Sequence, residues 1–247
     1  MNTDNSASLT IGFTGDLAFS GYFADCCGDD TLLGDGIKSF LGANDYNVIN
    51  FESPVTPCRI TKKKRLAHRS SPEALDFVKR NIKNPVLSFA NNHMMDFGTV
   101  GVVDTIESCK AAGVPFIVKG VMTVKGALKA KAAGAAGIVV SNHGGRVLDQ
   151  CPATAEVLPG IAEALKGSGV KVLVDGGIRS GVDVFKALAL GADAALICRP
   201  FVPAVYGGAA EGVKLFIDKI GAELSDTMTM CGAKDLASIT RDMVFTK

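Results

Sequence analysis

Short apolar segments alternate with segments of helical periodicity along almost the whole chain. Repeats of this kind place successive strands in a parallel sheet, wound open or closed into a barrel. The sequence therefore predicts an α/β fold. Strands are expected near residues 9–14, 47–51, 86–90, 114–118, 137–140, 170–174 and 194–197, one fewer than a closed eight-stranded barrel needs. Helices are expected near residues 36–41, 72–79, 100–112, 124–133, 155–165, 182–190, 212–228 and 233–241.

The character of this repeat changes near residues 113–115. Before that point the turns carry Asp, Asn and His side chains, and after it the repeat is rich in Ala and Gly with short, regular loops. We therefore expect two parts, residues 1–113 and residues 114–247. Nothing between them resembles a flexible linker, which allows the two parts to share one sheet.

The amino-acid composition indicates which kinds of binding partner and which cellular compartment to expect. With 26 basic and 25 acidic residues in 247, the net charge of +1 provides no general field for nucleic acid. The seven cysteines form no CxxC pair, which is typical of a reduced protein. The amino-terminal residues are polar, and no apolar stretch is long enough to span a bilayer. We expect a cytoplasmic protein without nucleic-acid or membrane partners.

Polar side chains follow the expected strands of the second part at the points where those strands end. In a parallel barrel these carboxyl ends meet at one mouth, where the chemistry lies. Two glycines and then an arginine, in residues 144–146 and again in 176–179, suit a phosphate held by backbone N–H groups and a guanidinium. His143 can act as a base near neutral pH, and Lys119 can stabilise a developing anion. Taken singly, each also has a structural interpretation as a hydrogen-bonded histidine, a turn or a solvated lysine.

Together these segments resemble a known family. The stretches PFIVKG, GIVVSNHGGRVLDQCPATAEVLP, VLVDGGIRSGVDVFKALALGA and ICRP make residues 115–245 similar to the carboxyl-terminal half of the FMN-dependent 2-hydroxy acid oxidases and dehydrogenases, such as glycolate and lactate oxidase. In that family these segments form the second half of a TIM barrel. The resemblance implies FMN as the cofactor and a small 2-hydroxy acid as the substrate, oxidised to the 2-oxo acid.

The resemblance also implies a role for each matching residue. His143 would take the substrate's proton as the electron pair moves to flavin N5, and Arg146 would pair with the substrate carboxylate. Lys119 would lie beside flavin N1 and stabilise the anionic reduced ring. The residues that would hold the flavin and its phosphate are Lys119, Ser141, Asp175, Gly177, Arg179 and Arg199. Cys198 stands where the family usually has glycine before the last arginine.

Residues 8–116 resemble a different family. The stretches IGFTGDLAFSG, VINFESPVT, SPEALDFVK and SFANNHMMDFGTVGVVDTIESCKAAGVPF are similar to the start of the CapA-type capsule and poly-γ-glutamate synthesis proteins, which have a metallophosphatase-like fold. Oxygen and nitrogen ligands at strand ends would form part of a divalent metal site, with Asp96 orienting a histidine. These candidate ligands are Asp16, Glu52, Asn92 and His93. That family needs further histidines from its second half, so we expect this site to be incomplete.

Three hypotheses about function remain open. The chain is an FMN-dependent 2-hydroxy acid oxidoreductase, a metal-dependent or polymer-synthesis protein of the capsule type, or a folded chimera without catalytic activity. The first ranks highest, although residues 1–113 do not resemble the half-barrel that supplies the substrate tyrosines and the aspartate orienting the base. Because half-barrels expose an apolar edge, the first part or another copy of the chain must cover it, and we expect a homo-oligomer.

Overall fold

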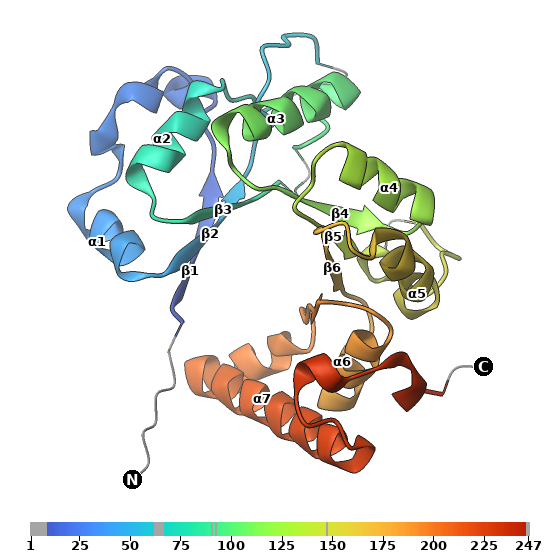
Figure 1. Cartoon of the computed structure of the whole chain (residues 1–247). Coiled ribbons are helices and arrows are strands. Elements are labelled where there is room, and N and C mark those ends of the chain that lie inside the picture. Colours follow the sequence, from blue (N-terminus) through green and yellow to red (C-terminus); the bar gives the residue numbers. More distant parts are fainter. Residues whose placement is uncertain (1–8, 62–66, 90, 92, 147, 246–247) are drawn as a thin grey trace. The chain divides into compact units, whose positions relative to one another are not determined.

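The computed structural model describes residues 9–61, 67–89, 91, 93–146 and 148–245. The chain divides into two compact units, Met1–Ile117 and Val118–Lys247. In both units strands alternate with helices along the chain (Figure 1). Within the described ranges, no helix combines the length and the apolar character needed to cross a membrane.

The first unit contains a parallel sheet in the order β1-β2-β3. Its core includes Phe51 and Phe77, which are almost completely buried. The ring of Phe19 packs edge-on against that of Phe77, with a centroid distance of 4.9 Å. The elements of this unit are β1 (Ile11–Leu17), α1 (Asp35–Ala43), β2 (Tyr46–Phe51), α2 (Glu73–Asn81), β3 (Pro85–Ser88) and α3 (Gly98–Ala112).

The second unit contains a sheet in the order β4-β5-β6-β7. All four residues of β5 are buried, as expected for a central strand of a parallel sheet that is covered on both faces. Leu158 and Ile161 on α5 add to the buried core of this unit. The elements are β4 (Ile117–Val121), α4 (Val124–Ala132), β5 (Gly137–Val140), α5 (Thr154–Leu165), β6 (Lys171–Val174), α6 (Gly181–Ala189), β7 (Ala194–Ala195) and α7 (Phe201–Cys231).

In both sheets each strand lies beside its neighbours in sequence. The pairs β1–β2, β2–β3, β5–β6 and β6–β7 are parallel. This order is that of a TIM barrel, in which the chain winds in one direction, and differs from the order of a doubly wound sheet. The predicted α/β fold of alternating strand–helix units is therefore confirmed, and β5 has the predicted bounds.

Strand β4 begins later than predicted, at Ile117 instead of residue 114. Gly113 ends α3 in the left-handed conformation, with φ of 66°, and the N–H of Val114 bonds back to the carbonyl of Cys109. Pro115 then has no N–H to donate to a neighbouring strand. Residues 113–116 therefore complete the end of α3 before the strand begins.

Helix α7 contains the predicted helix 212–228 but begins at Phe201. Its one break is at Ala209, where φ is 45° and ψ is −129°. The backbone of α7 packs directly against α6, because a Cβ at Gly181 would collide with the backbone N of Leu224. This contact holds the long helix against the rest of the unit.

The prediction of a helix over residues 233–241 is wrong. The segment instead contains the 3₁₀ turns Leu236–Ser238 and Arg241–Met243. The side chain of Asp235 accepts a hydrogen bond of 2.8 Å from the backbone N–H of Ser238. Such a local bond competes with helix formation, and it stabilises a turn in a segment too short to form a helix alone.

Candidate functional site

The residues predicted to hold a flavin lie at the carboxyl ends of the strands of the second unit. Lys119 is in β4, Ser141 follows β5 directly and Asp175 follows β6 directly. Arg199 lies in the connection between β7 and α7. In parallel sheets the ligand crevice lies outside these ends.

Lys119 contacts both Ser141 and Asp175. Lys119 Nζ donates hydrogen bonds of 2.8 Å to Ser141 Oγ and of 2.8 Å to Asp175 Oδ2. Ser141 is buried, and the side chains of Lys119 and Asp175 are 33% and 20% exposed. One cation therefore joins the ends of three adjacent strands.

The second carboxylate oxygen of Asp175 has a different environment. Oδ1 is buried and has no hydrogen-bond partner among the residues that the structure describes. Most buried acceptors in folded proteins are paired, because an unpaired one loses its water without replacement. Oδ1 is therefore a position where a hydroxyl or N–H group of a ligand would be stabilised.

The loop after β5 carries the predicted base in an unusual backbone conformation. His143, Gly144 and Gly145 have φ values of 55°, 65° and 72°, all in the left-handed region. The N–H of His143 donates to Ser141 Oγ at 3.2 Å, which links this loop to the Lys119 contact. His143 and Arg146 are exposed, so both side chains are accessible to a substrate. A non-glycine residue in this region costs about 1–3 kcal/mol and is found most often at functional sites.

The guanidinium of Arg199 lies against this loop. A Cβ placed on Gly144 would collide with Nη2 of Arg199. Glycine at this position therefore permits close approach of an arginine from the β7–α7 connection. The structure thus brings Arg199 to the loop that carries the predicted catalytic residues.

The turn after β6 leads into the amino terminus of α6. Gly176 and Gly177 have φ values of 90° and 82°. The N–H groups of Arg179 and Ser180 donate to Asp183 Oδ2, at 3.0 and 3.1 Å. Gly177 and Arg179 are exposed at this turn, as expected for groups that would contact a phosphate at a helix amino terminus.

A carboxylate on α7 also contacts this end of α6. Glu223 Oε2 accepts a hydrogen bond of 2.8 Å from the N–H of Gly181. The hydrogen bond from Lys219 and then the bond from Gly181 lower the pKa of Glu223. Glu223 therefore holds α6 in place as an anion.

Three residues that support these loops had no assigned role in the sequence analysis. Asp183 forms a capping box with Ser180, and the spacing of a serine and an acidic residue three positions later is a recognisable signal for it. Thr154 donates to the carbonyl of Asp175 at 2.7 Å, and Asn142 accepts from the N–H of Gly144 at 3.0 Å. The Asn142 bond is a local turn of a kind that asparagine favours, whereas the Thr154 bond joins segments 21 residues apart, for which the sequence contains no local signal.

The first unit also has polar side chains at the carboxyl ends of its strands. Asn50 Nδ2 donates to Asp16 Oδ1 at 2.7 Å and also to Glu52 Oε2. His93 Nε2 lies 3.7 Å from Glu52 Oε1. The structure therefore places Glu52 beside His93. The side-chain amide of Asn50 links Asp16 to Glu52.

Asp96 holds His93 as predicted. Its carboxylate is fully buried, and Oδ2 lies 2.7 Å from His93 Nδ1. The same oxygen accepts a bond of 2.9 Å from the backbone N–H of His68. The ring of His68 lies edge-on to that of His93, with a centroid distance of 4.2 Å. These contacts fix the orientation of the His93 imidazole.

The predicted metal ligands do not form a complete centre in the described part of the chain. Within it, no group of three or more His, Cys, Asp or Glu side chains is placed to hold a metal ion. Asn92 lies outside the described residues. The metal site therefore stays a prediction.

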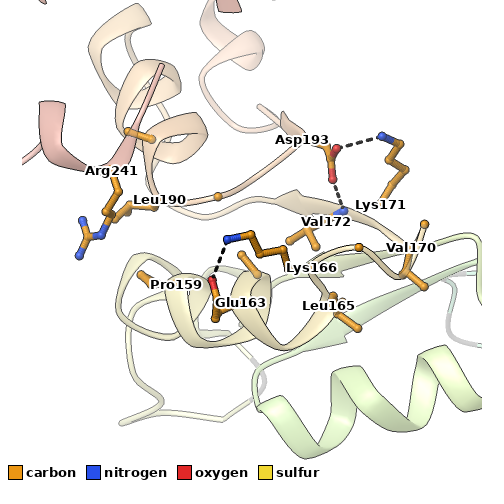
Figure 2. A pocket seen from close by; sticks show the side chains of 15 residues that line it. Pro159, Glu163, Leu165, Lys166, Val170, Lys171, Val172, Leu190, Asp193 and Arg241 are labelled. Atoms are coloured by element: carbon orange, nitrogen blue, oxygen red, sulfur yellow. Dashed lines mark hydrogen bonds and ion pairs between the residues drawn. The ribbon is translucent and has the colours of Figure 1, made fainter. Parts of the chain in front are cut away.

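A pocket of about 520 Å³ lies at the amino end of β6, the end opposite Asp175 (Figure 2). Charged pairs line its rim, with Lys171 Nζ 3.0 Å from Asp193 Oδ1 and Lys166 Nζ 3.8 Å from Glu163 Oε2. None of the predicted site residues lines it. In TIM barrels the catalytic residues lie at the carboxyl ends of the strands, so the site is better assigned there than to this pocket.

Comparison with known proteins gives a consistent result. Residues 48–246 match the family model described as FMN-dependent dehydrogenase. The chain is 48% identical over 133 residues to the peroxisomal (S)-2-hydroxyacid oxidase GLO3 of Arabidopsis thaliana, covering 54% of this chain and 36% of that protein. It is 41% identical over 170 residues to an L-lactate oxidase of Lactobacillus jensenii, covering 68% of this chain and 41% of that one.

Solved structures give the same indication. A crystal structure of a mandelate oxidase variant with benzoyl-formic acid has a TM-score of 0.60 and 30% identity, covering 83% of this chain and 70% of that chain. A second mandelate oxidase structure, with a TM-score of 0.60 and 28% identity, covers 94% of this chain. The fold of this chain is therefore similar to part of the TIM barrel of mandelate oxidase.

These matches do not support the capsule-synthesis resemblance of residues 8–116. The family model begins at residue 48 and so includes most of the segment assigned to that resemblance. None of the proteins named above is a capsule-synthesis protein. The chimera interpretation, which depended on the same resemblance, is likewise without support.

Proposed function

This chain belongs to the FMN-dependent dehydrogenase family, and on that premise we propose that it binds FMN and oxidises a small 2-hydroxy acid to the 2-oxo acid. The similarity to a 2-hydroxyacid oxidase and an L-lactate oxidase supports this class of substrate. The chain spans 36% and 41% of the lengths of these two relatives. Because the match covers less than half of each relative, we assign their oxidase activity to this chain only as a proposal.

The residues at the carboxyl ends of β4, β5 and β6 fit the cofactor. FMN has a ribityl chain with several hydroxyl groups and ends in a phosphate. The buried Oδ1 of Asp175 is an acceptor without a donor among the described residues, and a ribityl hydroxyl would supply one. Lys119 contacts Asp175 directly, and Ser141 is linked to Asp175 through Lys119. Lys119 and Ser141 would hold the flavin ring and the adjoining part of the ribityl chain.

The phosphate would be held by the turns after β6 and β7. Arg179 and Arg199 offer guanidinium groups, which bind phosphate through paired N–H donors. Gly177 has no side chain to block approach to its backbone N–H, and α6 begins four residues later. These groups are assigned to the phosphate as part of the proposal.

The catalytic roles follow from residue chemistry. Bound FMN would accept the two electrons that the substrate loses. His143 would take up the proton of the substrate, and its exposed position makes the imidazole accessible. Arg146 would hold the substrate carboxylate. Lys119 would stabilise negative charge on the cofactor ring, because its ammonium is already held by Ser141 and Asp175.

The observation that carries the proposal is the contact of Lys119 with Ser141 and Asp175, together with the buried Asp175 oxygen that no described residue pairs with. The test is to add FMN to purified protein, remove free cofactor by desalting and record the visible spectrum. Retained yellow flavin that is bleached by L-lactate or glycolate under anaerobic conditions is the expected result. Protein that retains no flavin would overturn the proposal.

Two intermediate outcomes separate the alternatives. Retained flavin that no 2-hydroxy acid bleaches would support FMN binding and reject the oxidation step. A cooperative thermal transition that FMN does not shift would favour a folded protein without catalytic activity, the third hypothesis of the sequence analysis. The division into residues 1–113 and 114–247, the cytoplasmic location and the homo-oligomeric state remain predictions beside this proposal.

A further inference from the structure

Two polar side chains between β5 and β6 tie the loops of the proposed site together. They are Asn142, in the loop after β5, and Thr154, the first residue of α5. We refer to this pair as the β5–β6 brace. Neither residue belongs to the set assigned above to FMN or to the substrate.

Thr154 fixes the turn that follows β6. The threonine is buried, and its hydroxyl lies 2.7 Å from the carbonyl oxygen of Asp175 and 3.5 Å from that of Gly176. A Cβ on Gly176 would lie 3.1 Å from Thr154 Oγ1, so the turn packs closely on this hydroxyl. One buried side chain therefore sets the backbone from which the Asp175 carboxylate projects.

The hydroxyl of Thr154 is not used to cap its own helix. The exposed N–H of Ala153 at the start of α5 is instead satisfied by Glu156 Oε2 at 2.9 Å. A threonine near the amino terminus of a helix usually caps that helix. Here Glu156 bonds to the N–H at the helix start instead of Thr154. The Thr154 hydroxyl instead donates its hydrogen bond to the carbonyl of Asp175, at the end of the neighbouring strand β6.

Asn142 fixes the loop that follows β5. Its Oδ1 accepts a hydrogen bond of 3.0 Å from the N–H of Gly144, beside the left-handed His143. Its Nδ2 donates to the carbonyl of Pro152 at 3.3 Å, two residues before Thr154. The amide therefore anchors the loop that carries His143 to the segment that leads into α5.

We propose that the β5–β6 brace is a positioning device, in which Thr154 and Asn142 hold the Asp175 turn and the His143 loop ready for a ligand that carries both hydroxyl groups and a phosphate. This inference rests on the proposed function, because FMN is the ligand of that chemistry. The brace removes loop freedom before the ligand arrives, so that less ordering entropy opposes binding. Its two residues act through other groups and are positioning residues.

The test compares Thr154→Val with Thr154→Ser. Valine keeps the branched shape but removes the hydroxyl, whereas serine keeps the hydroxyl. The FMN dissociation constant, measured by quenching of flavin fluorescence, should rise about tenfold in Thr154→Val and stay within about threefold of wild type in Thr154→Ser. Asn142→Asp keeps the acceptor for the Gly144 N–H but loses the donor to Pro152, and about a threefold rise is expected.

A matched control is available in the first unit. Thr105 is equally buried, and its hydroxyl donates to the carbonyl of Gly101 at 2.6 Å. Thr105 Oγ1 also accepts a bond of 2.9 Å from the N–H of Val55, so Thr105→Val should lower the thermal midpoint without FMN at least as much as Thr154→Val does, but leave the FMN dissociation constant unchanged. If Thr105→Val weakens FMN binding as strongly as Thr154→Val, the effect is one of general stability and the proposal fails.

A readout without FMN separates this inference from the proposed function. Amide hydrogen exchange at Asp175, whose N–H donates to the carbonyl of Val140 at 3.1 Å, should be about tenfold faster in flavin-free Thr154→Val than in flavin-free wild type. Unchanged exchange, or an unchanged FMN dissociation constant in Thr154→Val, overturns the brace. If wild-type protein binds no FMN, the proposed function fails, and the role of the brace in FMN binding fails with it, whereas exchange still reports whether Thr154 fixes the turn.

Discussion

The carboxyl edges of the two sheets contain similar polar residues, but these residues differ in whether their hydrogen-bonding groups are paired. In the first unit the groups satisfy one another: Asn50 donates to Asp16 and Glu52, and Asp96 contacts His93 and the backbone of His68. At the edge of the second unit, Asp175 Oδ1 has no donor among the described residues. There the backbone of the predicted base is also held in a left-handed conformation.

This difference distinguishes a network that stabilises a fold from a site that a ligand completes. Buried polar groups that pair with one another are stabilising, whereas an unpaired acceptor and a strained backbone lower stability and are retained where function needs them. Residue type alone does not separate the two cases, since both edges carry aspartate and histidine. The two cases are distinguished by the hydrogen-bond partners of each group.

The largest expected effect is on the oxidation rate. His143→Gln should reduce kcat for the proposed 2-hydroxy acid oxidation by about 10³-fold or more, because glutamine cannot take up the proton. FMN should still be retained, as His143 is not assigned to the cofactor. The matched variant His68→Gln in the first unit, measured in the same steady-state assay, should keep kcat within about twofold. Similar losses in both variants would contradict the division of roles between the two edges.

The next effect is on stability, and it is larger in the first unit. Asp96→Asn should lower the free energy of unfolding by about 2 kcal/mol, because the fully buried carboxylate loses its charge-assisted contact with His93. Asp175→Asn should cost less than about 1 kcal/mol, since its pair with Lys119 is partly exposed and its other oxygen has no partner to lose among the described residues. Urea denaturation of both variants without FMN measures the difference. A larger loss in Asp175→Asn would reverse the comparison.

A smaller effect is expected from two glycines with the same backbone. Gly144 and Gly113 have φ values of 65° and 66°, and a Cβ at Gly113 would meet nothing within 4 Å. Alanine at either position should cost about 1 kcal/mol of stability through the backbone. Only Gly144→Ala should also weaken FMN binding, by about tenfold, because its Cβ displaces Arg199. Equal FMN dissociation constants for the two variants would show that Arg199 does not act on the phosphate.

The smallest effect concerns two thiols. Burial raises the pKa of the Cys109 thiol, in the first unit, from its ordinary value of 9.0 to about 12, whereas Cys198 is exposed beside Arg199. Iodoacetamide at pH 8 should therefore modify Cys198 and leave Cys109 unmodified in the folded protein, as measured by peptide mass spectrometry. Inorganic phosphate or FMN should slow the reaction of Cys198. Labelling of Cys109 at the rate of Cys198 would contradict the buried state of its thiol.

The same shift has a defined sign for stability. A raised thiol pKa means that the folded state favours the neutral form of Cys109. Its contribution to stability is therefore fully present below the unfolded pKa, and it is lost as the pH rises above about 9 toward 12. Cys109→Ala should remove this part of the alkaline pH dependence.

Much of the strand pattern was predictable from the sequence. The run Ile138–Val140 is apolar and is followed by polar residues at Ser141, so β5 was located with its observed bounds. The helix predictions differ from the structure near the carboxyl end of the chain. Helix α7 begins at Phe201, eleven residues before the predicted helix, and it breaks at Ala209, beside Gly207 and Gly208, which are poor helix formers.

The candidate site was predictable in its members and less so in its contacts. Lys119 in β4 and the polar residues after β5 and β6 could be named because strand ends are recognisable along the chain. The contact of Arg199 with Gly144 and that of Thr154 with Asp175 depend on how separate segments pack, which no local pattern encodes. The resemblance of residues 8–116 to the capsule-synthesis proteins, which the comparisons do not support, has a related cause. Asp and His at the ends of parallel strands suit many kinds of site, and short stretches of this type do not specify one family.

The unpaired oxygen of Asp175 also has a consequence for protein supply in a cell. A folded chain that gains a missing donor from its ligand is held folded by mass action, and each tenfold excess of free ligand over its dissociation constant adds about 1.4 kcal/mol. The abundance of this protein would then follow the availability of flavin, because chains made during a flavin shortage would unfold more often and be degraded sooner. The free energy of ligand binding, to which this oxygen would contribute, would in this way connect the lifetime of the protein to the flavin content of the cell.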